Sequence, residues 1–477
     1  MSVKDHRLQA RVSLADRGAV HTVRDTNTSK RPMKLGPEIR RLLLNKEVRR
    51  YSANTTWLLA EKGVAMLAAL LVGTWVARYL GPARFGTLSY VVGVAILAKP
   101  ILSLGLEGIL SREMVRHPEE SSELIATSTL LRSVASLLYV LFIAGGLYLV
   151  HRDWLYAALG VVVGIGHSLL MLSEPIQYYF RSRVEARLNV VPQIAGHLLG
   201  SGAKVAFILA GAGVVWLAIG NLIVASTTAL LLWAVYAVKA GRFIDFNDIS
   251  TARASSLLKE SWPLIIAGTS NIVVLHIDTV MLHQMLGSVD VGIYTAAVRI
   301  STLFYFVPML VGWSLQPAVI RAQQHSTELY RRRLRQILTG LTLLALCLTA
   351  LIVVSSGQLV SLLYGSEYAQ SAAVLRVHAW QLVVIFSSQT RSLAVITESH
   401  FKFEMLSGLL GGILNVAANL LLIPRFGAVG AAIATLVSYF FVHIGFGLLY
   451  KPMRWLSVEQ IKTILIFGIF KHIRERR

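Results

Sequence analysis

Long uncharged apolar stretches recur along this chain and constrain its fold more than any other feature. Residues 214–238 read VVWLAIGNLIVASTTALLLWAVYAV and contain no charged side chain. A helix rises about 1.5 Å per residue, so roughly twenty residues cross a hydrocarbon core about 30 Å thick. The sequence therefore predicts helices that span a membrane.

The composition supports the same fold class. The 477 residues are 55% hydrophobic and 15% charged, whereas soluble domains are about 45–50% apolar and about 25% charged. We expect an all-α polytopic membrane protein with about twelve transmembrane helices. The predicted spans are residues 55–79, 86–110, 124–150, 154–179, 190–210, 214–238, 262–286, 292–320, 336–356, 372–397, 404–423 and 428–450.

Basic residues between these spans alternate strongly from one side to the other. If both termini are cytoplasmic, 35 of the 46 Lys and Arg residues lie on the inside, 4 on the outside and 7 within spans. Basic residues gather in cytoplasmic loops of membrane proteins. The net charge of +21 therefore indicates topology rather than nucleic-acid binding, and we expect a bacterial plasma-membrane protein with both termini inside.

The polar ends and the central polar segment give the expected domain limits. We expect a basic, disordered cytoplasmic tail over residues 1–50, with Met33 as an alternative translation start. A six-helix bundle over 51–240, a cytoplasmic linker over 241–261 and a second six-helix bundle over 262–450 follow. Residues 451–477 form a basic tail with a short interfacial helix.

An internal repeat relates the two predicted bundles. LGPARFGTLSY begins at Leu80 and LGSVDVGIYTA at Leu286, so Gly81 and Gly86 correspond to Gly287 and Gly292 at an offset of 206. Glycine suits tight turns that need positive φ. The repeat predicts two pseudo-symmetric bundles, each beginning with the same outside hairpin, as in transporters built from duplicated units.

Motifs for catalysis are absent from the sequence. It contains no P-loop, HExxH or nucleophile elbow, and the DFND stretch at Asp245–Asp248 is expected to be a solvated turn. The single cysteine, Cys347, forms no internal disulfide and matches no metal-ligand spacing. We therefore predict no catalytic residue, no metal, no cofactor and no enzymatic activity.

Four predicted helices each carry a cation within an apolar run. Charges in the bilayer are costly and face a cavity or a partner. The sequence predicts a positive cavity for an anionic substrate, above all a phosphate. Separate structural pairs involving Glu61 or Glu174 are the alternative. The four cations are Lys62, Lys99, Arg132 and Lys204.

Opposite charges also flank the second hairpin. Asp278 and Arg299 lie eleven residues before and ten after Val289, so helical rise places them at about the same depth. We predict a mutual ion pair that acts as a switch, in which protonation or ion binding at Asp278 releases Arg299. His276 and His283 are candidates to tune it, or are ordinary hydrogen-bonded groups.

Several sequence blocks resemble polysaccharide-biosynthesis flippases. They include ARYLGPARFGTLSY, LSLGLEGILSRE, LLYGSEYAQSAAVLRV and LNVAANLLLIPRFGAVGAAIATLVSY, and the resemblance covers nearly all of residues 51–450. These flippases belong to the multidrug/oligosaccharidyl-lipid/polysaccharide exporter superfamily. They translocate O-antigen and exopolysaccharide repeat units.

The resemblance implies two six-helix bundles that face alternately in and out, and a cationic central cavity. Members of the family often have fourteen spans, whereas this chain stops after twelve and a stub. The cavity cations that fit this implication are Lys62, Lys99, Arg132, Lys204 and Arg299.

The expected function is therefore translocation of undecaprenyl-diphosphate-linked oligosaccharides from the inner to the outer leaflet. A coupling ion, H⁺ or Na⁺, is expected to act at Asp278 or Glu61. Expected partners are this lipid, membrane lipids and the polysaccharide polymerase machinery. Rival functions are a multidrug and toxin extrusion transporter, a membrane glycosyltransferase or ligase, and a peptidoglycan-precursor flippase.

Overall fold

The computed structural model describes residues 46–241, 245 and 248–465. Contacts divide the chain into two units, Met1–Arg50 and Tyr51–Arg477, and the second contains nearly all the described residues. Almost all of the predicted tail 1–50, including Met33, lies outside the described residues. The described part is helical and contains no strand, as predicted for an all-α fold.

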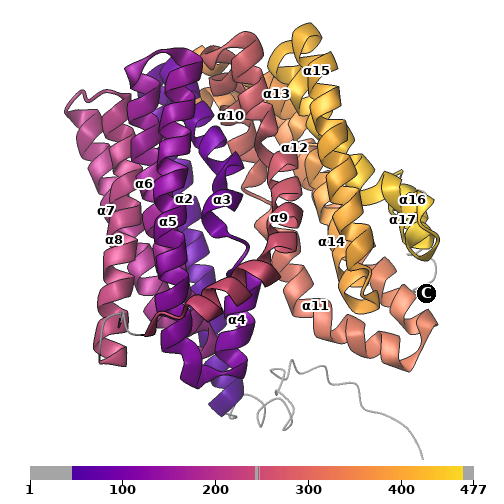
Figure 1. Cartoon of the computed structure of the whole chain (residues 1–477). Helices are drawn as coiled ribbons and strands as arrows, with labels where there is room; N and C mark the ends of the chain where they lie inside the picture. The colour runs from indigo at the N-terminus through magenta and orange to yellow at the C-terminus, as the bar shows by residue number, and fades with distance from the viewer. Residues whose placement is uncertain (1–45, 242–244, 246–247, 466–477) are drawn as a thin grey trace, which may run out of the picture. The chain divides into compact units, whose positions relative to one another are not determined.

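The first half of the molecule is built from antiparallel helices joined by short turns (Figure 1). Asp153 caps one of them, because its side chain accepts a hydrogen bond from the Leu155 amide at 2.8 Å. The elements are α2 (Lys46–Leu97), α3 (Lys99–Ser103), α4 (Glu107–Arg116), η1 (Pro118–Glu120), α5 (Ser121–His151), α6 (Trp154–Ser182), α7 (Ala186–Leu209) and α8 (Val214–Ala240).

The second half begins with a helix capped by Ser250, whose side chain accepts a hydrogen bond from the Arg253 amide at 3.2 Å. Its elements are α9 (Thr251–Leu286), α10 (Ser288–Thr302), α11 (Phe306–His325), α12 (Thr327–Tyr364), η3 (Ser366–Tyr368), α13 (Ser371–His378), α14 (Gln381–Glu398), α15 (Phe401–Phe440), the π-helix η4 (Phe441–Gly445), α16 (Phe446–Leu449) and α17 (Lys451–Ile464).

Eight helical segments of the described chain are long and apolar enough to cross a membrane. Two of them, within α2 and α15, each contain a glycine with positive φ at which one helix ends and another begins, Gly81 (φ 69°) and Gly427 (φ 60°). Most of the twelve predicted ranges fall on one helix or one part of an interrupted helix. Twelve crossings remain a prediction, whereas the multi-pass architecture is plain.

The helices differ from the predicted ranges in two segments. The predicted span 86–110 is broken, because positive φ angles at Leu104 and Gly105 separate α3 from the amphipathic helix α4. Much of the predicted linker 241–261 is helical, because α9 starts at Thr251 and continues without interruption into the second half. The part of the predicted linker from Thr251 onward therefore belongs to α9.

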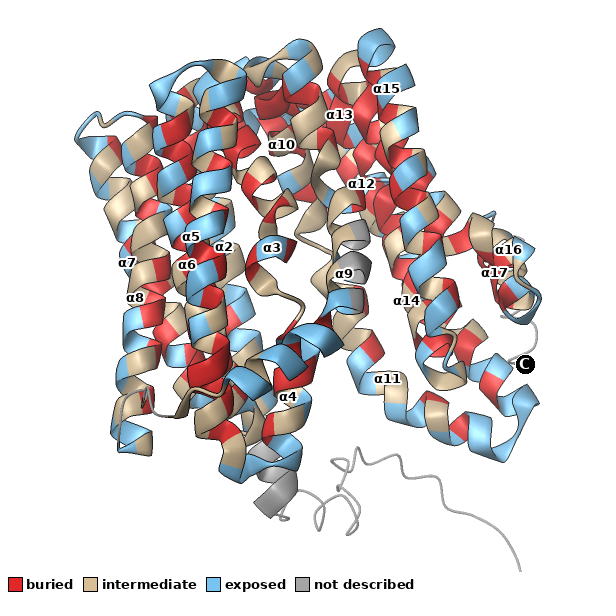
Figure 2. Ribbon diagram, viewed as in Figure 1, coloured by how far each residue is buried: buried red, intermediate tan, exposed pale blue. Residues whose placement is uncertain are grey.

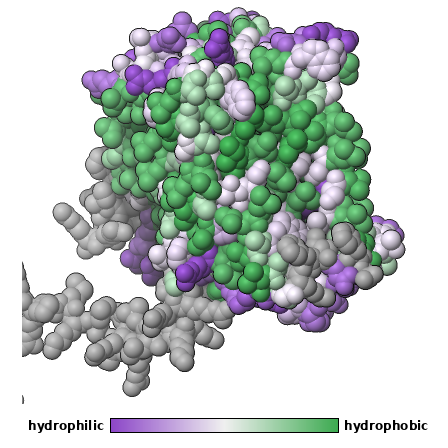
Figure 3. Space-filling view, turned by 90° about the vertical axis from the view of Figure 1, so that its left-hand side faces the viewer, coloured by the Kyte–Doolittle hydropathy of each residue, from purple (hydrophilic) through white to green (hydrophobic). Residues whose placement is uncertain are grey.

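The surface carries the apolar side chains expected of a membrane protein. Buried residues concentrate between helices and exposed residues along their outer faces (Figure 2). Many exposed residues are large and apolar, for example Leu230 (69% exposed) and Val354 (86% exposed). Figure 3 shows an apolar band with hydrophilic residues at both ends, which matches a hydrocarbon core between two headgroup layers.

The predicted repeat brings the two halves together at one end, here called the glycine end. Gly81 and Gly287 both have positive φ, 69° and 95°. A methyl group on Gly86 would overlap the carbonyl oxygen of Ser288, and one on Gly292 would overlap that of Pro82. Pro82 corresponds to Ser288 at the offset of 206. The contact is therefore reciprocal, as a pseudo-two-fold relation requires.

The start of α9 lies near α4 (Figure 1). Ion pairs join the two regions, and this end is called the ionic end here. An Arg112 nitrogen lies 2.7 Å from a Glu260 oxygen. Arg253 lies 2.6 Å from Glu120 and 3.5 Å from Glu113. These contacts fasten the helix that enters the second half to the helices of the first half.

Candidate functional site

Arg299 extends from α10 of the second half onto α2 of the first half. Its guanidinium lies 4.8 Å from the centre of the buried Phe85 ring, and one of its nitrogens would lie 3.2 Å from a methyl group on Gly73. Arg299 is nevertheless exposed and has no ion-pair partner among the described residues. A cation between the two halves is therefore open to an incoming anion.

Lys204 provides a second cation within electrostatic reach of Arg299. Its aliphatic stem packs on Gly220 of α8, where an added methyl would lie 3.2 Å from Cε. The absence of a side chain at Gly220 therefore makes room for the lysine. Lys204 is half-buried and makes no ion pair within the part of the chain that the structure describes.

Lys62 lies on α2, on the same face as Gly73 and nearer the start of the helix. Lys62 and Gly73 are eleven residues apart, which is about three turns and about 16 Å along one face of α2. His197 and Lys204 are seven residues apart on one face of α7, and His197 interacts electrostatically with Lys62 and Lys204. Lys62, His197, Lys204 and Arg299 are called the cationic track below.

Glu61 lies beside the start of the track. It is buried, with 7% of its side chain exposed, and its carboxylate lies 3.1 Å from the Lys62 ammonium, which is 59% exposed. The predicted alternative that Glu61 pairs with a neighbouring cation is therefore observed. Lys62 still presents most of its side chain to solvent.

Lys99 is separate from the track. It begins α3 and is half-buried, and it lies within electrostatic reach of His167 of α6. His167 Nδ1 lies 2.8 Å from the Tyr139 hydroxyl, which donates to the Ala95 carbonyl at 2.7 Å. No contact in the described chain links Lys99 to Lys204 or Arg299.

Arg132 does not line a cavity, contrary to the prediction. Its side chain is fully buried and lies 3.3 Å from the Glu174 carboxylate. Arg132 also donates to the Met171 carbonyl at 2.7 Å, and Tyr178 donates to Glu174 at 2.7 Å. A guanidinium so enclosed needs a carboxylate partner, which makes this a structural pair.

The predicted ion pair between Asp278 and Arg299 is wrong. Asp278 accepts hydrogen bonds from the Tyr294 hydroxyl at 2.7 Å and from the Asn419 amide at 2.6 Å. Tyr294 and Arg299 are five residues apart on α10, about 140° around the helix. Because Tyr294 faces Asp278, Arg299 faces away from it, toward Gly73.

Asp278 instead lies in a cage of neutral oxygen-bearing side chains from α10 and α15. The Thr435 hydroxyl contacts Asp278 and also lies 2.9 Å from the Ala431 carbonyl. One hydroxyl hydrogen cannot serve both acceptors, whereas a proton on the Asp278 carboxyl, donated to the Thr435 hydroxyl, would satisfy both contacts. Asn415 completes this group, called the Asp278 cage.

One oxygen of the cage is buried without a hydrogen-bond partner, the Asn419 Oδ1. The Asn419 amide also donates to Asn415 Oδ1 at 3.0 Å. Oxygen ligands of this kind suit hard cations. Sequence reasoning missed both asparagines, although two Asn residues one helical turn apart in an apolar run were a usable signal.

A separate group of exposed ligand types lies near the ionic end. His117, Glu119 and Glu120 are close enough to hold a metal, but Glu120 is already paired with Arg253 at 2.6 Å. His117 lies 3.5 Å from Glu119. We regard this group as part of the ion-pair network.

The profile of a family described as Polysaccharide biosynthesis protein matches residues 52–308, more than half of the chain. A probable flippase, AglR, from Haloferax volcanii is 24% identical over 378 residues, which cover 77% of this chain and 76% of that protein.

Two solved structures have a similar fold. An inward-facing multidrug resistance MATE family transporter of the MOP superfamily gives a TM-score of 0.67 at 17% identity, over 83% of this chain and 96% of that one. The lipid II flippase MurJ in an inward closed conformation gives 0.64 at 13% identity, over 89% and 99%. At sequence identities of 17% and 13%, these similarities show a shared fold and nothing more.

Proposed function

Because the chain belongs to the polysaccharide biosynthesis protein family, we propose that it is a flippase for undecaprenyl-diphosphate-linked oligosaccharide repeat units. It would act in a bacterial plasma membrane with both termini in the cytoplasm, beside the polysaccharide polymerase machinery. The observation that carries this proposal is the cationic track. Arg299 and Lys204 lie within electrostatic reach of each other and have no carboxylate partner in the described chain.

The track suits a diphosphate that carries a lipid chain. Two neighbouring cations without a counter-ion repel each other until an anion lies between them. Arg299 offers a planar set of N–H donors and Lys204 a compact ammonium. Lys62, about 16 Å along α2 from Gly73, is the cation an incoming diphosphate meets first, while the prenyl chain stays in the lipid.

Alternating access follows from the two ends of the interface between the halves. With the topology predicted from basic residues, the glycine end faces outward and the ionic end faces the cytoplasm. Contact between Gly86 and Ser288 and between Gly292 and Pro82 closes the outer end. Separation of these backbones would open the track to the outer leaflet.

The Asp278 cage is the proposed seat of ion coupling. Asp278, Asn415, Asn419 and Thr435 would hold H⁺ or Na⁺, which neutralises the buried carboxylate when bound. Tyr294 donates to Asp278 at 2.7 Å, and the same helix α10 carries Arg299 on its other face. A shift of α10 when the carboxylate changes partner therefore moves Arg299 relative to Gly73.

Charge reversal in the track tests the proposal. We expect Lys204→Glu and Arg299→Glu to reduce flipping of a fluorescent polyprenyl-diphosphate oligosaccharide in proteoliposomes more than tenfold, because each substitution repels the diphosphate. Arg84→Glu is the matched control, since Arg84 is an exposed hairpin arginine that is not one of the four track residues. Undiminished flipping by both track variants, with unchanged melting temperatures, would refute the proposal.

Multidrug extrusion is the rival that the fold keeps open. The track disfavours it, because Lys62, Lys204 and Arg299 repel a cationic substrate. Efflux of a cationic dye by cells that express the protein, abolished by Asp278→Asn but unaffected by Lys204→Glu, would support the rival instead. Sugar transfer in proteoliposomes would support a glycosyltransferase, and rescue of a strain lacking its peptidoglycan-precursor flippase would indicate that substrate.

A further inference from the structure

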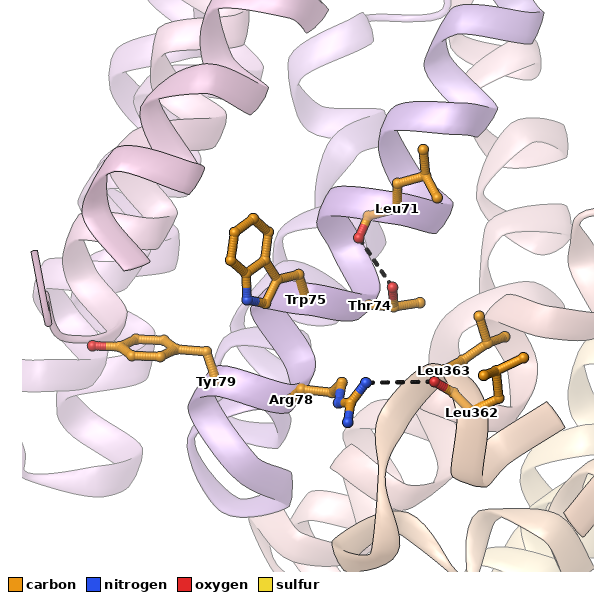
Figure 4. Close-up of a pocket in the computed structure, with 7 residues that line it drawn as sticks. All are labelled: Leu71, Thr74, Trp75, Arg78, Tyr79, Leu362 and Leu363. Atoms are coloured by element: carbon orange, nitrogen blue, oxygen red, sulfur yellow. Dashed lines mark hydrogen bonds between the residues drawn. The ribbon is translucent and has the colours of Figure 1, made fainter. Parts of the chain in front are cut away.

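A pocket of about 500 Å³ lies where α2 of the first half meets α12 of the second (Figure 4). It is called the Arg78 pocket here. Its lining residues are Leu71, Thr74, Trp75, Arg78, Tyr79, Leu362 and Leu363.

The pocket extends along the outer part of both helices at the glycine end. Arg78 lies three residues before Gly81, about 4.5 Å by helical rise, and Leu71 about 15 Å before it. Leu362 lies two residues before Tyr364, where α12 ends. The pocket therefore covers the depth from a headgroup layer to the middle of one leaflet.

Arg78 is the only charged group of the pocket and is largely unused. One guanidinium nitrogen donates to the Leu362 carbonyl at 3.5 Å, the limit of a hydrogen bond (Figure 4). Arg78 has no carboxylate within ion-pair distance among the described residues. Four of its five N–H donors are therefore available to an anion.

The two hydroxyl groups of the pocket already have hydrogen-bond acceptors. The Tyr79 hydroxyl donates to the Ala212 carbonyl at 3.0 Å, and the Thr74 hydroxyl lies 2.6 Å from the Leu70 carbonyl. The remaining lining is apolar and exposed, with Leu71 at 64% and Leu362 at 73%. One free guanidinium above an apolar floor, bordered by Trp75 and Tyr79, is the chemistry of a lipid phosphate site at a membrane interface.

We propose that the Arg78 pocket binds a lipid with a phosphate headgroup. The guanidinium contacts the phosphate, and a hydrocarbon chain lies along Leu71 and Leu362. Because α2 and α12 belong to different halves, the bound lipid contacts both at the glycine end. The lipid is either an anionic phospholipid of the bilayer or a polyprenyl phosphate, since both present the same phosphate above an apolar chain.

Native mass spectrometry of the full-length protein in detergent tests the proposal. Phosphatidylglycerol, phosphatidylcholine and undecaprenyl phosphate are titrated separately. We expect Arg78→Gln to weaken binding of an anionic lipid about tenfold, because charge-assisted hydrogen bonds to phosphate are lost. Arg84→Gln, an exposed hairpin arginine outside the pocket, keeps wild-type binding. If Arg78→Gln loses binding of phosphatidylglycerol only, the ligand is a bilayer lipid. If it loses binding of undecaprenyl phosphate only, the ligand is a polyprenyl lipid.

A second measurement keeps the charge and fills the pocket. Leu362→Trp retains Arg78 but occupies the chain-binding floor, so we expect anionic lipid binding to fall several-fold with the melting temperature unchanged.

A quenching experiment places the lipid beside Trp75. Brominated phosphatidylglycerol should quench the tryptophan fluorescence of the wild type more than that of Trp75→Phe. Equal binding by wild type, Arg78→Gln and Leu362→Trp, or an equal loss in Arg84→Gln, overturns the proposal. None of these readouts requires transport.

Discussion

The two ends of the interface between the halves are built from opposite kinds of contact. At the glycine end, backbone lies against backbone, and Gly86 and Gly292 leave no room for a methyl group. At the ionic end, long side chains meet, and Arg112 and Glu260 remain 41% and 46% exposed. Close packing is lost at once when surfaces part, whereas exposed ion pairs contribute about 0–1 kcal/mol and re-form easily.

This difference assigns distinct tasks to the two ends. We propose that the glycine end is the barrier to leakage, because the backbones of the two halves lie in direct contact there. The ionic end holds α9 to α4 through Arg253 and Arg112 while allowing movement, as a flexible tether does. Substitutions at each end should therefore have effects of different size.

The largest effect is expected at the glycine end. Gly86→Leu places a side chain on the Ser288 carbonyl, and overpacking of this kind costs about 1–3 kcal/mol. We expect flipping in proteoliposomes to fall at least tenfold and a cysteine introduced at Ser288 to become more accessible to a water-soluble thiol reagent. Gly63→Leu is the control, since nothing lies within 4 Å of its added carbon. Equal loss in both variants would contradict the closure role.

The next largest effect is expected in the Asp278 cage, on the helices that meet at Gly287. Asp278→Asn keeps the shape but removes the charge, so flipping should lose its dependence on an ion gradient and fall several-fold. Asp278→Leu removes the acceptor of the Tyr294 hydroxyl and one of the two acceptors of the Asn419 amide, at about 1–3 kcal/mol for each buried group left unpaired, and should lower the melting temperature. If flipping by Asp278→Asn still depended on the ion gradient, the Asp278 cage would have no part in ion coupling.

A smaller effect is expected at the ionic end. Arg253→Glu places a carboxylate beside Glu120, and we expect flipping to change less than threefold because the pair is partly exposed. The double variant Arg253→Glu/Glu120→Arg should restore the wild-type rate. A tenfold loss that the double variant fails to restore would show that the ionic end is as rigid as the glycine end.

The smallest effect concerns acid stability at the ionic end. A hydrogen bond from Arg112 is the main reason that the pKa of the Glu113 carboxyl lies below its ordinary value of 4.5, and the charges of Arg253 and His117 act in the same direction. The stabilisation is complete above that value and is lost as pH falls through the lowered pKa. Melting temperatures of wild type and Glu113→Gln should differ slightly at pH 7 and converge below about pH 4.5. A melting-temperature difference between the two proteins that increases at acidic pH would contradict this prediction.

Features set by local backbone chemistry could be predicted from the sequence. Gly81 and Gly287 need positive φ wherever the hairpins lie, so the repeat and most helix ends were correct. The family resemblance was also correct. The prediction of a continuous span over 86–110 was wrong. The chain breaks at Leu104 and Gly105, where α9 approaches closely. The Ser261 carbonyl of α9 would lie 2.8 Å from a methyl group added to Gly105.

Side-chain direction could not be predicted in the same way. Depth along a helix follows from sequence separation, so Asp278 and Arg299 were placed at one level. The rotation of each helix depends on packing with distant elements, and it turns Arg299 toward Gly73 and Asp278 toward Asn419. Arg132 was misassigned for the same reason, because only the fold shows that Glu174 lies beside it.

The position of Arg299 has a consequence for when an anion is released. Its guanidinium belongs to one half, but Phe85 and Gly73 beneath it belong to the other. Parting of the halves at the glycine end would lift Arg299 off that aromatic support and increase its distance from Lys204. The movement that uncovers a bound phosphate would thus also weaken the grip on it, so unloading would need no separate trigger.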